Sequence, residues 1–129
     1  MSEALLLEKA QSAAEKAYAP YSNYPVGACV MTESGELFTG CNVENGSYSA
    51  TVCAERVAIF KAISHGARVV TALALFTENR ALPCGTCLQV LSEFARDGEI
   101  LIYAGSPTGS VSYRLSELLP HAFQFKPKP

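Results

Sequence analysis

The sequence has little charge, and its charges nearly cancel. Charged residues make up 17% of the 129 positions, apolar residues make up 49%, and the net charge is −2 at pH 7. Long-range attraction to phosphates is therefore weak, which argues against duplex nucleic acid or an anionic membrane as a partner. The sequence also lacks the basic, aromatic-interleaved patch of a nucleic-acid editing protein. We expect a small, neutral or weakly charged ligand instead.

The sequence also lacks an export signal and a long hydrophobic run. Glu3 and Glu8 surround the only apolar cluster near the N-terminus, where a signal peptide would have a basic segment and an unbroken apolar one. No run approaches the length needed to span a membrane. These absences predict a cytoplasmic protein whose five cysteines stay reduced, as ligands or buried thiols.

The length and the order of elements predict one α/β domain over residues 1–129, with a flexible tail at 126–129. Apolar periodicity predicts helices at residues 4–18, 53–64 and 84–94, and a helical turn at 116–120. Apolar and β-branched runs predict strands at residues 26–33, 36–43, 68–77, 99–105 and 110–115. This order predicts a three-layer α/β/α sandwich around a mixed five-stranded sheet.

Three of the cysteines fall where predicted helices begin. Cys53 opens the second helix, and Cys84 and Cys87 open the third in "PCGTC". A helix N-terminus favours a thiolate over a thiol, because it carries partial positive charge and unpaired N–H groups. If both helix starts meet at the ends of the central strands, three thiolates converge and leave one tetrahedral position open, as in a catalytic zinc site. Cys29 and Cys41 alternate with strand residues and are interpreted as core thiols.

The two histidines bear on whether a fourth protein ligand closes this site. His65 lies about 18 Å along its helix from Cys53, at about 1.5 Å per residue, which is too far to share a metal within one subunit. Spacing leaves His121 open as a ligand, although a surface position after Pro120 is the more common interpretation. A closed site would make the chain a non-catalytic, zinc-stabilised binding module. A redox dithiol at "CGTC" is a weaker alternative.

Glu55 and Arg56 follow Cys53 in "VCAER". A carboxylate beside a zinc site that is open to water can carry a proton from water to a leaving group, if it is not itself a ligand. Glu55 diverges from Cys53 by about 200° on a helix wheel, but a cysteine at a helix start can project along the axis. Arg56 is placed to donate to the cysteine sulfurs and to offset their negative charge. In isolation, both residues would more often form a solvated helix face.

Two further segments, "YAPYSNYPVGA" and "GCNVENGSY", accompany the zinc motifs "CAER" and "PCGTCLQV". C-A-E followed by P-C-x-x-C is typical of zinc deaminases. From Tyr18 to Phe123 the chain resembles the short homotetrameric cytidine deaminases. The resemblance implies the cytidine deaminase-like fold, one zinc ion per subunit and a hydrolase of pyrimidine salvage. Its reaction would convert cytidine and 2′-deoxycytidine to uridine and 2′-deoxyuridine and release ammonia.

The resemblance also implies roles for residues of the same subunit. Asn42 and Glu44 would hold the ribose hydroxyls, and Tyr24 would pack against the ring. The Ala54 backbone and Glu55 would meet the pyrimidine edge. The chemistry suits these roles, because an amide and a carboxylate fit vicinal hydroxyls and an aromatic ring offers a stacking face. The alternative for "NVEN" is a turn after a strand.

Other site residues would come from neighbouring subunits. Gly46 and Tyr48 would be supplied by one neighbour and Phe123 by another, whereas the alternative for Phe123 is a hydrophobic anchor of the tail. The family more often has Phe at the position of Tyr24, Ala at that of Gly46 and Arg at that of Leu88. A tyrosine should preserve stacking on the ring.

We expect Glu55 to move protons from water to ring N3 and then to the departing amine, while hydroxide attacks C4. A deaminase for another aminated heterocycle, such as blasticidin S, is an alternative on the same scaffold. Glu44 argues against it, because a ribose-specific carboxylate has no evident use on a sugar without those hydroxyls.

Overall fold

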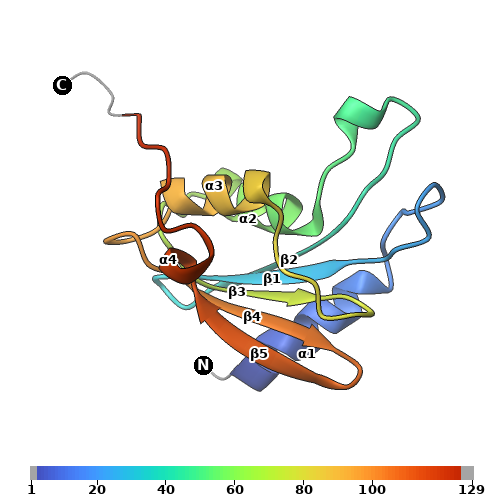
Figure 1. The fold of residues 1–129 in the computed structure, drawn as a ribbon, viewed down its shortest axis with the longest axis horizontal. Helices are drawn as coiled ribbons and strands as arrows, with labels where there is room; N and C mark the ends of the chain where they lie inside the picture. The colour runs from blue at the N-terminus through green and yellow to red at the C-terminus, as the bar shows by residue number, and fades with distance from the viewer. Residues whose placement is uncertain (1–2, 126–129) are drawn as a thin grey trace.

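The computed structural model describes residues 3–125, which build one five-stranded sheet with helices on both faces (Figure 1). Its strands are β1 (Gly27–Thr32), β2 (Leu37–Cys41), β3 (Val70–Phe76), β4 (Leu101–Ser106) and β5 (Gly109–Arg114). They lie in the order β2-β1-β3-β4-β5; β3 and β4 run parallel, and the other neighbouring pairs are antiparallel. The predicted mixed sheet is therefore confirmed. The tail expected at 126–129 lies outside the described residues.

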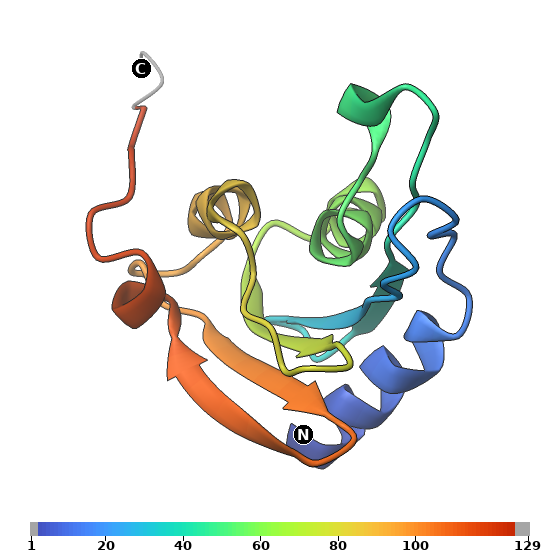
Figure 2. The same cartoon turned by 45° about the vertical axis from the view of Figure 1, so that its right-hand side comes forward.

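The helices form the two outer layers. They are α1 (Glu3–Ala14), α2 (Ala54–Ser64), α3 (Gly85–Glu93) and α4 (Leu115–Leu118), with a 3₁₀ turn η1 at Tyr48–Ala50. Figure 2 shows α2 and α3 side by side over one face of the sheet and α1 over the other. The predicted three-layer sandwich is confirmed by this arrangement.

The sheet separates two apolar cores. Side chains of α2 and α3 pack with one set of strand residues, among them Val30 and Leu73. Leu6 and Ala10 of α1 pack with the alternate set on the opposite face, among them Cys29. Successive strand side chains point to opposite faces, so a strand covered on both sides needs an almost unbroken apolar run. β3 has that composition, "VTALALF".

Two glycines allow the helices to approach the sheet closely. A Cβ atom at Gly40 in β2 would lie 2.6 Å from the backbone nitrogen of Ala58 in α2. A Cβ atom at Gly27 in β1 would lie 1.8 Å from the carbonyl oxygen of Ala10 in α1. A side chain at either position would push a helix outward. At Gly40 this would also move the start of α2.

Two predictions about local structure are wrong. The first helix ends at Ala14 instead of residue 18. Tyr18 instead forms a β-bridge with Val43, and the Tyr18 N–H donates to the Asn42 carbonyl at 3.0 Å. Cys41 is only half-buried, and its thiol donates to the Lys16 carbonyl. It lies in β2, an edge strand that the helices cover incompletely. Cys29 is a core thiol as predicted, and burial raises its pKa to about 11.

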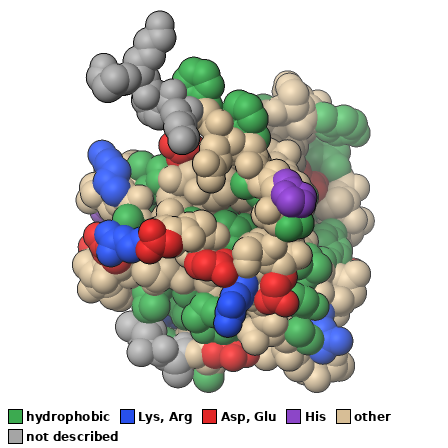
Figure 3. Space-filling view, turned by 60° about the vertical axis from the view of Figure 1, so that its left-hand side comes forward, with side chains coloured by type: hydrophobic (Ala, Val, Ile, Leu, Met, Phe, Trp, Pro, Cys, Tyr) green, Lys and Arg blue, Asp and Glu red, His purple; other side chains and the backbone are tan. Residues whose placement is uncertain are grey.

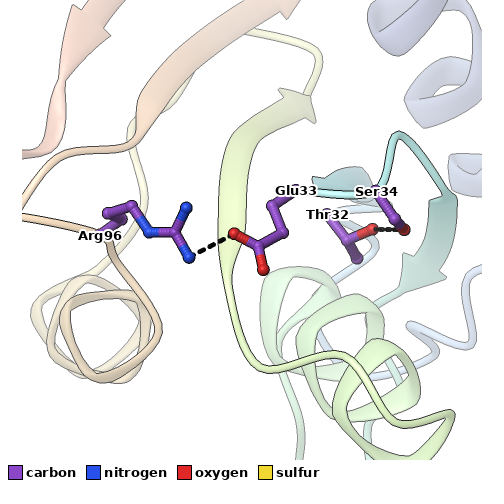
Figure 4. Close-up of polar contacts among 4 residues, drawn as sticks. All are labelled: Thr32, Glu33, Ser34 and Arg96. Atoms are coloured by element: carbon purple, nitrogen blue, oxygen red, sulfur yellow. Dashed lines mark hydrogen bonds and ion pairs between the residues drawn. The ribbon is translucent and has the colours of Figure 1, made fainter.

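The surface carries few, mixed charges. On the face in Figure 3, acidic and basic side chains form small mixed groups, and apolar side chains lie between these groups. Arg96, which follows α3, places its Nη2 atom 2.5 Å from Oε2 of Glu33 in the β1–β2 turn (Figure 4). At the same turn, the hydroxyl oxygens of Thr32 and Ser34 are 3.0 Å apart. Such an exposed ion pair contributes at most about 1 kcal/mol. Within residues 3–125, no helix has both the length and the apolar character to cross a membrane.

Candidate metal centre

Cysteines occupy the N-cap positions of both helices that begin at the carboxyl end of β3. Cys53 precedes α2 and Cys84 precedes α3, each with an extended backbone and no side-chain capping bond. An N-cap Ser, Thr, Asp or Asn would use its side chain to satisfy a backbone N–H of the helix. The two thiols are therefore free to act as ligands. Cys87 follows within the first turn of α3.

The three sulfur atoms converge. Those of Cys53, Cys84 and Cys87 lie within 4.8 Å of one another, and the Cys84 and Cys87 sulfurs are 3.5 Å apart. A tetrahedral zinc site with Zn–S bonds of about 2.3 Å places its sulfurs about 3.8 Å apart, so the three thiols fit a zinc ion. Within residues 3–125, no histidine joins them. His65 instead contacts the Lys61 carbonyl, and His121 is exposed.

The cluster stabilises negative charge on sulfur. A hydrogen bond from the Cys87 thiol, together with Arg56, lowers the pKa of Cys53 to about 5 against the opposing effect of burial. The same shared proton raises the pKa of Cys87. A metal ion would replace this proton and take up the thiolates. Cys29 behaves in the opposite way, because burial raises the pKa of its thiol and outweighs the lowering effect of the Lys9 charge.

Arg56 lies behind the sulfurs. Its Nη2 donates to Cys53 Sγ at 3.5 Å, and this bond raises the arginine's pKa. Its Nε is buried without a hydrogen-bond partner within residues 3–125. The contact with Cys53 is the one expected from the sequence, and a cation at this position can offset thiolate charge. Leu88, the next residue after Cys87, is 7% exposed and packs into the core instead of supplying a second cation.

Glu55 lies beside the cysteines and is 4% exposed. Burial raises the pKa of its carboxyl group to about 6, and the charge of Cys53 adds to this effect. A carboxyl group with a pKa near neutrality can both accept and return a proton. Cys53 at the N-cap and Glu55 in the first turn line the same cavity, so the divergence on the helix wheel does not separate them.

The cavity holds about 460 Å³, which is within the usual range for small-molecule sites. Of the residues expected at the substrate, Tyr24, Asn42, Glu44 and Ala54 line it together with Glu55. The rest of its wall carries no motif in the sequence and comprises Ser22, Val26, Thr51, Val52, Leu75, Thr77, Ala81 and Leu82. The wall is mainly apolar, with a few polar groups, and it lies where ligands bind in α/β sheets, at the carboxyl ends of the strands.

Asn42 and Glu44 also hold the 18–26 segment in place. Asn42 Nδ2 donates to the Tyr24 carbonyl and its Oδ1 accepts from the Val26 N–H, both at 2.9 Å. Glu44 Oε1 accepts from two backbone N–H groups, and its Oε2 accepts from the Ser22 hydroxyl. These bonds, led by that of Ser22, lower the pKa of Glu44. A carboxylate has about four acceptor positions, so one remains for a ligand hydroxyl.

Gly46, Tyr48 and Phe123 are not among the residues that line the cavity of their own chain. Gly46 and Tyr48 lie on the segment between β2 and α2, which extends away from the sheet (green in Figure 2). Tyr48 is 75% exposed and Phe123 is 70% exposed. The Gln89 side-chain amide holds the Phe123 backbone by two bonds, donating to its carbonyl at 2.7 Å and accepting from its N–H at 3.2 Å.

Comparison with known proteins agrees with this geometry. Residues 1–104 match the family described as "Cytidine and deoxycytidylate deaminase zinc-binding region". The chain belongs to this family. Cytidine deaminase of Sporosarcina psychrophila is 45% identical over 121 residues, which cover 92% of this chain and 88% of the relative. The crystal structure of cytidine deaminase from Burkholderia pseudomallei has 41% identity and a TM-score of 0.90 and covers 95% of this chain and 100% of the other.

One of the alternatives considered from the sequence also has a relative of lower identity. Blasticidin-S deaminase of Bacillus cereus is 30% identical over 126 residues, which cover 88% of this chain and 89% of the relative. This identity is lower than that of the cytidine deaminases compared above.

Replacing any one cluster cysteine by alanine should weaken zinc binding by more than about 100-fold. Loss of a residue that only hydrogen-bonds to a metal ligand already weakens metal binding by about 10–100-fold, and loss of the ligand itself should weaken it further. Metal analysis and competition with a chromogenic chelator measure this change. Cys41→Ala is the matched control and should retain one zinc ion per chain. Unchanged zinc affinity in the Cys53→Ala or Cys84→Ala variant would contradict the assignment.

Proposed function

We propose that the protein catalyses the hydrolytic deamination of cytidine and 2′-deoxycytidine, which consumes water and yields uridine or 2′-deoxyuridine and ammonia. The observation that carries this proposal is that Glu55 and two cysteines of the cluster share one cavity with Tyr24 and Glu44. The first group supplies hydrolytic chemistry, and the second suits a base and a sugar. Family membership gives the reaction class.

Cys53, Cys84 and Cys87 would hold the zinc ion, one per chain. When bound, zinc lowers the pKa of a water molecule from 15.7 toward about 7 and so supplies hydroxide at neutral pH. Three protein ligands leave the fourth position open for this chemistry. Arg56 keeps the sulfurs anionic through its bond to Cys53. These roles match those expected from the sequence.

Glu55 moves the protons of the reaction. Its carboxylate accepts one proton from water and passes it to N3 of the pyrimidine, while the hydroxide oxygen bonds to C4. The remaining hydroxyl proton travels by the same carboxylate to the amino group, the C4–N4 bond breaks and ammonia leaves. Burial favours this role, because a carboxyl group shielded from water exchanges protons with the substrate in preference to solvent.

The sugar and the base are held by separate parts of the wall. The remaining acceptor position of Glu44 takes a ribose hydroxyl, and the unused donor of Asn42 lies on the same segment. Tyr24 offers a ring face to the base, and the Ala54 backbone meets its edge next to Glu55. The ionised Glu44 favours a sugar that offers a ring hydroxyl to its free acceptor position, as ribose and 2′-deoxyribose both do, over a sugar without one. Cytidine is therefore preferred over blasticidin S as substrate.

Cytidine turnover, followed by the fall in its ultraviolet absorbance, tests this proposal. The zinc-loaded chain should deaminate cytidine, and a chelator should abolish the activity. Glu55→Gln should lower kcat by about 100-fold to 10,000-fold with zinc content retained, because it removes only the proton carrier. Retained turnover would contradict the role of Glu55, and loss of zinc would show that Glu55 is structural. Faster turnover of blasticidin S in parallel would overturn the substrate assignment.

We also propose that the protein is a homotetramer in which each active site contains residues from neighbouring subunits. It would act in the cytoplasm, in pyrimidine salvage. Gly46 and Tyr48 would reach one neighbour and Phe123 another. Support comes from the exposure of Tyr48 and Phe123 and from the Gln89 bonds that fix the Phe123 backbone. An exposed aromatic ring with a fixed backbone is suited to insertion into another subunit. Free cysteines support a reducing, cytoplasmic environment.

Co-expression of two inactive variants tests the shared site. Phe123→Ala chains lack the donated ring, and Glu55→Gln chains lack the proton carrier. In mixed oligomers, about one quarter of the sites should combine an intact Glu55 with an intact Phe123 from a neighbour. The activity per chain should then exceed the mean of the separate variants.

The Phe125→Ala variant, at another exposed phenylalanine, is the matched control. Its activity per chain should equal that of the unmodified protein. Mixed oligomers whose activity equals the mean of the separate variants would contradict a shared site.

A further inference from the structure

Tyr24 is attached to a second segment at the mouth of the cavity through its hydroxyl group. The phenol donates to Oδ1 of Asn79, which lies 55 positions along the chain in the turn after β3. Tyr24 stands on the segment before β1, whereas Ala81 and Leu82 of the 77–83 segment line the cavity with it. The bond therefore joins two segments of the cavity wall.

The backbone of Tyr24 is fixed as well. Its carbonyl accepts from Asn42 at 2.9 Å, and its N–H donates to the Ser22 hydroxyl at 3.1 Å. With the backbone held, the main remaining freedom is rotation about the side-chain torsions. A bond at the far end of a tyrosine restrains both torsions, which a phenylalanine at this position would leave unrestrained.

Asn79 is itself tied to the sheet. Its Oδ1 also accepts from the Thr77 hydroxyl at 3.4 Å, and Thr77 Oγ1 accepts from the Ala81 N–H at 2.7 Å. Thr77 is 1% exposed, and its backbone N–H donates to the Gly105 carbonyl in β4. A continuous series of contacts thus runs from β4 to the ring of Tyr24. Asn79 is exposed and does not line the cavity, so it acts through Tyr24.

We infer that Asn79 is a positioning residue that holds the ring of Tyr24 in orientation for the nucleoside base. The inference rests on the proposed deamination of cytidine. An ordered ring binds a planar base without first losing torsional freedom, so the bond strengthens substrate binding. Because the ring stacks on substrate and transition state alike, its loss is expected in KM more than in kcat.

A double-mutant cycle between Tyr24→Phe and Asn79→Leu tests this inference. Loss of one such hydrogen bond should raise KM for cytidine by about threefold to tenfold in each variant, with a smaller change in kcat. The double variant should resemble either single variant, because both changes remove the same bond. Asn79→Asp, which keeps an acceptor oxygen, should restore KM to near the value of the unmodified chain.

Two results would overturn the inference. The first is an unchanged KM in Tyr24→Phe. The second is an Asn79→Leu effect that multiplies with that of Tyr24→Phe, since Asn79 would then act on the 77–83 turn alone. Thermal unfolding of each variant shows whether the fold is retained. Cytidine turnover by the unmodified chain distinguishes failure of this inference from failure of the proposed function. If the unmodified chain does not turn over cytidine, the proposed function itself is refuted.

Discussion

The start of α2 and the start of α3 meet over the carboxyl end of β3, and the chemistry of the protein depends on that meeting. It brings three thiols within 4.8 Å although they belong to two segments separated by a whole strand. It also directs two helix N-termini, with their partial positive charge, at the sulfurs. The close contact at Gly40 sets the distance of α2 from the sheet. Zinc binding and the placement of Glu55 both follow from the positions of these two helices.

Charge at the centre is balanced by few groups. Three thiolates around one zinc ion leave one net negative charge, which makes nearby water a weaker acid. Arg56 is the cation that contacts the sulfurs within residues 3–125, and its Nε has no other partner there. Leu88 takes part in the apolar core. Within residues 3–125, the charge balance of the site therefore depends on one arginine.

Periodicity and helix-start signals were sufficient to predict the layers, the mixed sheet and the cysteine cluster. Their failures have physical causes. The residues after Ala14 are compatible with a helix, but Tyr18 forms a β-bridge with Val43 instead. This is a tertiary contact, and local helix propensity does not predict it. Strand alternation places Cys41 on one face of β2, but it does not show that this edge strand is poorly covered.

The contacts that hold Tyr24 and Phe123 could not be predicted from the sequence for another reason. Tyr24 and Asn79 are 55 positions apart, and Gln89 and Phe123 are 34 apart. Single asparagine and glutamine residues carry no pattern that identifies such partners. Both contacts use a side-chain amide to fix an aromatic residue assigned to the substrate. The motifs thus predicted the convergence of the three cysteines, and the fold adds long-range contacts that the motifs do not contain.

The central claim is that three cysteines hold zinc with one position open beside Glu55. X-ray absorption at the zinc edge, measured on the purified chain without substrate, tests it most directly. A site of three cysteines should give three sulfur neighbours and no outer-shell scattering from an imidazole ring. A fourth sulfur or a histidine in the zinc shell would rule out the open site, because a site closed by four protein ligands is structural and leaves no position for hydrolysis.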